Sequence, residues 1–177
     1  MLEEKLAANS PVIISIFCLL AVDRMKSIFD EFSKKYGKEI NRFDRILKSA
    51  YDMVFNFDSD ILGFLKAELG KLIPDTEDYR DVLADQAQCV PICLMYTLEY
   101  FSEGDFASVR YVLQKIEETI DIYGYEGGDA KVANEKEGEW QLTLFEKLCE
   151  IPKINPEVLQ GIKRENSIHL IPNVTSV

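Results

Sequence analysis

The sequence predicts an all-α fold, a single domain of about eight helices over residues 1–177. Apolar residues recur with the 3.6-residue period of a helix along the whole chain, whereas the alternating pattern of a strand is almost absent. Helix start and stop signals separate these periodic stretches. A chain of 177 residues, 47% of them apolar, is large enough to bury one core, and we find no linker or internal repeat that would divide it.

The first half begins with a short leading segment, residues 1–9, and then predicts three helices. Ser10 and Pro11 form a strong start signal, because a serine hydroxyl can cap a helix and proline suits its first position. Gly37 is a stop signal for the same helix. The three helices are expected over residues 11–35, 40–55 and 58–72.

The second half predicts longer helices and one clear loop. A long helix is expected over residues 76–101, and Pro91 should kink or break it near Gln88, because proline removes one backbone hydrogen bond. Residues 124–134, rich in glycine and acid, are predicted to form a loop. The tail, residues 168–177, has no helical pattern and is expected to be irregular and loose. The other helices are expected over residues 106–123 and 136–150 and from Asn155-Pro156 onward.

The negative charge is concentrated in one half of the chain. Residues 1–72 contain 11 Asp and Glu and 11 Lys and Arg, whereas residues 73–177 contain 20 and 9. The second part therefore carries the whole net charge of −11. Such a field repels nucleic acid and anionic lipid, and it speeds encounter with a basic protein. We therefore expect a protein partner, and neither nucleic acid nor membrane.

The sequence contains no convincing pattern for catalysis, a metal or a cofactor. The only histidine, His169, lies in the irregular tail, which argues against a histidine-based catalytic site. In the glycine-rich loop, Glu126 and Asp129 would repel a phosphate. Cys89 and Cys93 have no neighbouring zinc ligands, so they are expected to be core residues. We expect a protein that is not an enzyme and has no cofactor or metal.

The start of the chain and its cysteines predict a cytoplasmic protein. Leu2-Glu3-Glu4-Lys5 differs from the cationic start of a secretory signal. The apolar run over residues 11–22 is too short to span a bilayer and is better interpreted as a buried helix. The four cysteines lie in apolar helical stretches and are expected to be reduced and buried: Cys18, Cys89, Cys93 and Cys149.

The acids and tyrosines of the second half are the candidate partner-binding residues. A solvated acidic face would explain the total charge, but not its concentration in one half. Asp78, Asp81 and Asp85 are spaced to share one stripe of the predicted long helix. Tyrosine is enriched at protein interfaces, and two tyrosines lie at or near the predicted loop. The expected centre of the interface is Asp121, Tyr123, Tyr125, Glu126 and Asp129, with Asp78, Asp81 and Asp85 as its flank.

Short segments along roughly residues 12–163 carry a family resemblance. They are Val22-Asp23-Arg24-Met25, Arg42-Phe43-Asp44-Arg45-Ile46-Leu47, Ile73-Pro74-Asp75-Thr76-Glu77-Asp78-Tyr79, Glu139-Trp140, Leu144-Phe145 and Leu159-Gln160-Gly161-Ile162-Lys163. These segments resemble the YjaG-type family of bacterial proteins of unknown function. The resemblance implies an all-helical cytoplasmic domain without established catalytic residues. Some helical proteins of this kind are also similar to immunity proteins of contact-dependent growth inhibition systems, which neutralise one toxin, often a nuclease, by binding it.

These observations predict an immunity protein that binds and neutralises a cognate basic nuclease toxin, in the first instance an RNase. Its acidic surface would occlude the active site of the toxin in a complex of one monomer with one toxin domain. The alternative is a cytoplasmic housekeeping or scaffold protein of the YjaG-type family that acts as a homo-oligomer. A helical metal enzyme ranks last, because the Glu-x-x-His signature of di-iron proteins is absent.

Overall fold

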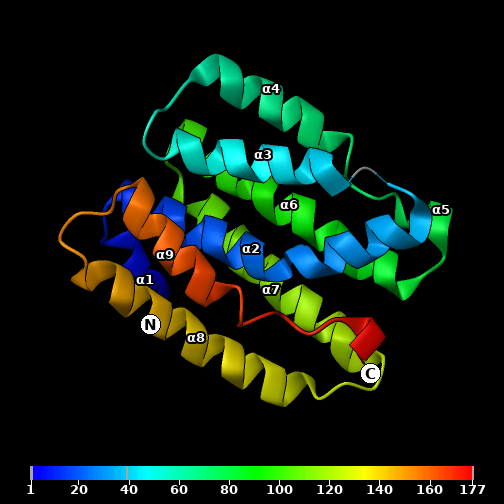
Figure 1. Ribbon diagram of the computed structural model, residues 1–177. Coiled ribbons are helices and arrows are strands. Elements are labelled where there is room, and N and C mark those ends of the chain that lie inside the picture. The colour runs from blue at the N-terminus through cyan, green and yellow to red at the C-terminus, as the bar shows by residue number, and fades with distance from the viewer. Residues whose placement is uncertain (1, 39, 177) are drawn as a thin grey trace.

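The computed structural model describes residues 2–38 and 40–176 and confirms the all-α fold (Figure 1). The described residues form nine α-helices and one short 3-10 helix, and they contain no strand. The helices are α1 (Leu2–Ala7), α2 (Pro11–Tyr36), α3 (Ile40–Met53), α4 (Ser59–Gly70), α5 (Thr76–Tyr79), α6 (Val82–Glu103), α7 (Phe106–Tyr125), α8 (Ala130–Glu150) and α9 (Pro156–Asn166), followed by η1 (Val174–Ser176).

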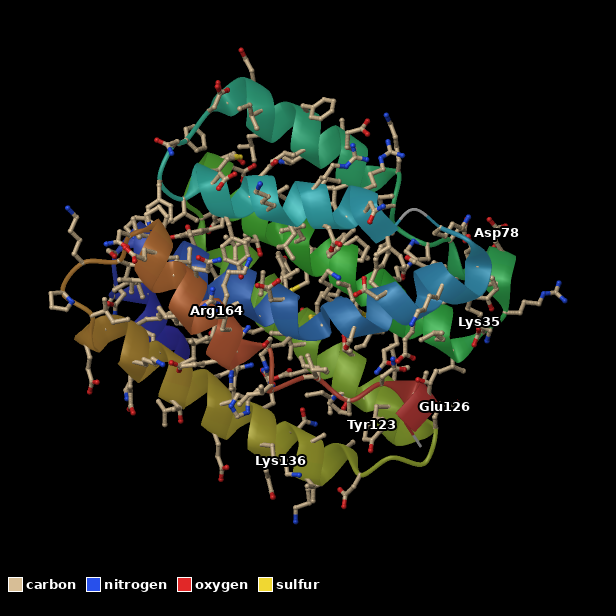
Figure 2. All side chains as sticks on the ribbon, viewed as in Figure 1. Lys35, Asp78, Tyr123, Glu126, Lys136 and Arg164 are labelled. Carbon is tan, nitrogen blue, oxygen red and sulfur yellow. The ribbon has the colours of Figure 1, made fainter. Side chains whose placement is uncertain are left out.

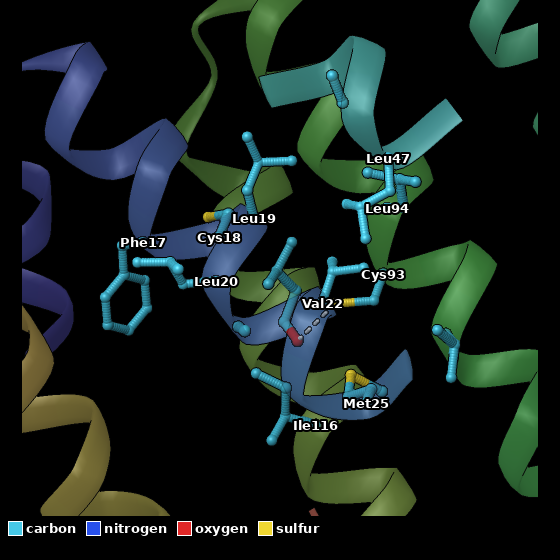
Figure 3. Close-up of a cluster of buried hydrophobic side chains, with 14 of the residues drawn as sticks. Phe17, Cys18, Leu19, Leu20, Val22, Met25, Leu47, Cys93, Leu94 and Ile116 are labelled. Carbon is cyan, nitrogen blue, oxygen red and sulfur yellow. Dashed lines mark hydrogen bonds between the residues drawn. The ribbon is translucent and has the colours of Figure 1, made fainter. Parts of the chain in front are cut away.

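Helix α2 is the centre of the bundle. It packs against α3, α6, α7, α8 and α9, and every residue from Ile14 to Val22 is buried. A helix that is covered on all sides has no need of a polar face, which explains the unbroken apolar run in the sequence. Figure 3 shows side chains of α2, α6 and α7, among them Met25, Leu94 and Ile116, within one buried apolar cluster.

The start and end signals of α2 act as predicted. The Ser10 side chain accepts a hydrogen bond from the backbone N–H of Ile13, and Pro11 occupies the first turn. Gly37 ends the helix with a φ of 64°, and its N–H donates to the carbonyl of Ser33. A glycine fits this left-handed position without steric strain.

The long helix predicted over residues 76–101 is wrong, because the chain forms two helices there. Arg80 adopts a left-handed φ of 47° and separates α5 from α6, and the Asp81 side chain caps α6 through the N–H of Leu83. Pro91 does not break α6, since the helix is continuous from Val82 to Glu103. The proline removes one N–H, but tight packing of α6 against α2 and α7 holds the helix on both sides.

The loop predicted over residues 124–134 is shorter than expected. Helix α7 extends to Tyr125 and α8 begins at Ala130, with Asp129 capping α8 through the N–H of Val132. Gly128 leaves room for Tyr123 in the short connection, because a Cβ there would lie 2.3 Å from the Tyr123 ring and would force the ring to move. Residues 130–134 are therefore helical once a cap is provided by the preceding aspartate.

The tail is irregular, as predicted, but the expectation that it is loose is wrong. Ile171 is buried, and its N–H donates to the carbonyl of Arg24 over 3.2 Å. The buried Gln86 amide donates to the carbonyl of Pro172 over 2.9 Å and accepts from the N–H of Val174 over 3.0 Å. These contacts hold the tail against the bundle although it has no helical pattern.

The leading segment and three of the four cysteines are packed into the bundle. Within residues 1–9, α1 packs against α8, and Leu6 is fully buried. Cys18, Cys89 and Cys93 are buried, and burial raises the pKa of the Cys18 thiol to about 12. The prediction that all four cysteines are buried is wrong for Cys149, which lies exposed on the outside of α8.

Within the described ranges, no helix combines the length and apolarity needed to cross a membrane.

Candidate functional site: an acidic end and a neighbouring cavity

Most of the predicted partner-binding acids lie at one end of the bundle. Helices α6 and α7 are antiparallel neighbours, so the start of α6 and the end of α7 lie together (Figure 1). Figure 2 shows Asp78 of α5 and Glu126, which follows α7, at this end. We call it the acidic end and define it by five exposed carboxylates: Asp78, Asp85, Asp121, Glu126 and Asp129.

The carboxylates of the acidic end have few internal partners. Asp78, Asp85, Asp121 and Glu126 form no ion pair with any other residue in the described ranges. Asp129 accepts a hydrogen bond from the backbone N–H of Val132 over 3.0 Å but remains exposed. Three helices and the α7–α8 connection thus carry exposed carboxylates near this end of the bundle, without an ion pair among the described residues.

Asp81 does not belong to this set, so the predicted stripe of three aspartates on one helix is wrong. Lys35 Nζ lies 2.6 Å from Asp81 Oδ2, and the Tyr36 hydroxyl donates to the same oxygen. Burial disfavours the charge of Asp81, but its hydrogen bonds from Lys35 and Tyr36 outweigh burial and lower its pKa. Asp81 is therefore a structural residue that ties α6 to the end of α2.

The two predicted tyrosine anchors differ in their surroundings. Tyr125 is the last residue of α7 and is 86% exposed. Tyr123 is half-buried, and its ring packs against Gly128 in the connection to α8. Only Tyr125 is free to be covered by a partner, while Tyr123 shapes the connection that positions Glu126 and Asp129.

Cations border the acidic end on its α2 side. Lys34 and Lys35 lie in the last turn of α2, and Lys38 lies 5.5 Å from the centre of the Tyr79 ring. Lys35 forms its ion pair with Asp81. The charge at this end of the bundle is therefore not uniformly negative, because cations at the end of α2 lie beside the acids.

A cavity of about 230 Å³ opens beside the α7–α8 connection. Tyr123 and Asp129 line it together with Lys136, and its buried wall contains Arg24 and Glu137. Two of the predicted site residues therefore meet at this cavity, although no sequence pattern placed them beside a residue of α2.

A buried ion pair forms the inner wall of the cavity. Arg24 is 5% exposed and Glu137 4% exposed, and Arg24 Nη1 donates to Glu137 Oε2. Arg24 Nε donates to the backbone carbonyl of His169, and the guanidinium carbon lies 3.6 Å from the centre of the Trp140 ring. Burial lowers the pKa of Arg24, and the charge of Glu137 opposes this shift.

The ion pair between Arg24 and Glu137 was not predicted from the sequence. The one available signal was the charged dipeptide Asp23-Arg24, which interrupts the apolar stretch of α2. In the part of the chain that the structure describes, no group of three or more His, Cys, Asp or Glu side chains could hold a metal ion. The acidic end thus lies next to a cavity wall in which the charges of Arg24 and Glu137 are paired with each other.

Comparison with known proteins shows the fold. No family model matches this sequence, and no curated protein matches it. The structure is similar to the crystal structure of a DUF416 family protein from Shewanella baltica OS155, with a TM-score of 0.82, 16% identity and coverage of 93% of this chain and 92% of that chain. At this identity the similarity shows a shared all-helical fold, so the resemblance to the YjaG-type family and to immunity proteins stays a prediction.

Proposed function

We propose that this protein binds a cationic protein through its acidic end, and that the partner is a basic nuclease toxin which it neutralises. The observation that supports this most is a set of exposed carboxylates that form no ion pair among the described residues: Asp78, Asp85, Asp121 and Glu126. Uncompensated charge gathered on one side favours a partner of opposite charge, whereas charge kept for solubility needs no such gathering.

The proposed mechanism is occlusion of the nuclease groove. Carboxylates of the acidic end occupy the positions where the toxin would hold phosphates, and long-range attraction raises the association rate constant to about 10⁸ M⁻¹s⁻¹ at low salt. Tyr125 supplies apolar contact area and a hydroxyl at the centre of the contact. Speed matters because an incoming nuclease must be bound before it cleaves RNA or DNA.

The test compares three versions of the chain as bait for partners in the source cell. D121K/E126K reverses two charges of the acidic end. E103K/E150K is the matched control, because Glu103 and Glu150 are equally exposed, lie outside any ion pair among the described residues, and end helices at the opposite end of the bundle.

We expect the wild type and the control to bind the same basic nuclease and block its activity, and D121K/E126K to lose at least tenfold in affinity. The association rate should fall steeply between about 50 and 200 mM salt, because screening shortens the reach of the attraction. Equal binding by D121K/E126K, or a rate that does not change with salt, would contradict the proposal. So would the recovery of no basic partner.

A further inference from the structure

Helix α4 has one packed face and one bare face. Leu62, Leu65 and Leu69 are buried against α3 and α6. On the other side, Phe64 is 64% exposed and Ile61 46% exposed. Figure 1 shows α4 at the edge of the bundle, with no helix beyond it. Because Ile61 and Phe64 are three positions apart on the helix, they form an exposed apolar patch that another chain can cover.

The bare face has a defined composition, and we call it the outer face of α4. Spaced by three and four positions, its residues follow one side of the helix: Asp60, Gly63, Phe64, Ala67 and Lys71. All of them are exposed, and a Cβ added at Gly63 would meet no atom within 4 Å. On this face Phe64 lies beside the small residues Gly63 and Ala67. Asp60 lies at one end of the face and Lys71 at the other.

This pattern is complementary to itself in the reverse direction. A two-fold axis between Leu65 and Lys66 would exchange Asp60 with Lys71 and Phe64 with Ala67. Phe64 of each helix would then lie on Ala67 of the other, and Asp60 of each helix would lie against Lys71 of the other. Each contact therefore occurs twice in the pair of helices. An interface between identical chains related by a two-fold axis requires this kind of reciprocal match.

We propose that the outer face of α4 binds a second copy of this chain, with the two α4 helices packed antiparallel. Phe64 of each copy covers Ala67 of the other, and Asp60 of each forms an ion pair with Lys71 of the other. Lys71 already forms an ion pair with Glu68 over 2.5 Å, but its side chain is 61% exposed, so its ammonium group is accessible to a second carboxylate from the other copy. This assignment departs from the monomer expected from the sequence.

The size of the contact sets its strength. Helix α4 has 12 residues and is about 18 Å long, so the contact buries less than the roughly 800 Å² per copy of a standard interface. The dimer should therefore dissociate on dilution. The acidic end lies on other helices, α5 to α8, so each copy keeps its own and the dimer presents two.

The first test measures the mass of the full-length protein by sedimentation over dilution from about 500 µM to about 1 µM, the range expected for a small interface. F64E should be monomeric throughout. I168E is the matched control, because Ile168 is 76% exposed and lies in the tail, and it should dimerise like the wild type. A wild type that is monomeric at every concentration, or an F64E variant that still dimerises, would overturn the proposal.

The second test uses the two charged contacts. D60K alone places like charges at both contacts, and K71D alone does the same with the opposite sign, so each variant should dimerise at least fivefold more weakly than the wild type. An equimolar mixture of D60K and K71D should recover the dimer, because both contacts are then attractive. Circular dichroism checks that each variant is folded. A mixture that gains nothing over the separate variants would overturn the antiparallel arrangement.

Discussion

The wall of the cavity and the acidic end both carry ionised side chains, but only in the wall does each charge meet a partner. Arg24 and Glu137 are almost fully buried, and Arg24 is further held by the carbonyl of His169 and the ring of Trp140. At the acidic end, by contrast, Asp121 and Glu126 point into solvent without a counter-charge from the described residues.

The difference separates charges that serve the fold from charges that are available for binding. An ion in the protein interior is tolerated only with a partner, since desolvation costs several kcal/mol. An exposed carboxylate keeps its water, so its neighbours can leave it unpaired at little cost. Mutations at the wall should therefore lower the free energy of unfolding, whereas mutations at the acidic end should leave it unchanged. We expect four variants to span this range, from the largest loss of stability to the smallest.

The largest effect is expected from E137Q, which leaves the Arg24 guanidinium buried without a counter-charge. The free energy of unfolding should fall by about 3–5 kcal/mol. Urea unfolding followed through the fluorescence of Trp140, the only tryptophan, measures it directly. R24M/E137L should regain most of the loss, because apolar side chains replace both charges. A loss below about 1 kcal/mol in E137Q would show that the pair is unimportant to stability.

A smaller loss is expected from Q86L. The Gln86 amide bonds the carbonyls of Thr119 and Pro172 and the N–H of Val174, and a leucine would leave these groups unsatisfied. The free energy of unfolding should fall by about 1–3 kcal/mol, and amide exchange in the tail should accelerate. Q114L, at an exposed position, is the control. An unchanged exchange rate at Val174 would contradict the role that we assign to Gln86.

D81N tests the predicted interface acid that forms an ion pair among the described residues. Asn keeps the cap of α6 but loses the charge that attracts Lys35, so the variant should be less stable by at most about 1 kcal/mol near pH 7. Because the pKa of Asp81 is lowered in the fold, its contribution exists above the unfolded pKa of about 3.9 and disappears as pH falls through the folded pKa.

The melting temperatures of wild type and D81N should therefore differ near pH 7 and converge as the pH falls through the folded pKa of Asp81, which lies below its unfolded value. A difference of the same size at both ends of this range would mean that Asp81 acts through its cap or its packing, and not through its charge.

The smallest effect on stability is expected from D121K/E126K. Both side chains are exposed and lack an ion pair among the described residues, so the free energy of unfolding should change by less than about 0.5 kcal/mol. Thermal unfolding of the variant beside E103K/E150K checks this. A loss above about 1 kcal/mol would show that these acids support the fold, and would remove the contrast between the two regions.

Local signals in the sequence predicted the helix starts well. Ser10 before Pro11 and Asn155 before Pro156 each begin a helix at the expected residue. In both pairs the polar side chain accepts a hydrogen bond from the N–H three positions ahead. These interactions span only a few residues, so they can be inferred from neighbouring letters. The concentration of acid in the second half was also visible, and the acidic end contains five of the eight residues whose charge or ring was predicted to form the interface.

Signals that depend on distant residues failed. Asp81 looked like one of three equivalent acids, but Lys35, 46 positions earlier, neutralises it. Pro91 carried a strong local preference against a helix, and the packing of α6 overrode that preference. Arg24 showed no sign of its partner Glu137, which lies 113 positions later.

Composition, periodicity and local capping signals therefore determined that this chain is all-helical, where most of its helices begin, and that its second half is strongly acidic. Only the tertiary structure decided which acids are unpaired, that the tail packs on Gln86, and that one face of α4 remains bare. The reason is physical: caps and amphipathic patterns act within a turn or two of helix, whereas the pairing of charges and the covering of surfaces depend on which helices become neighbours.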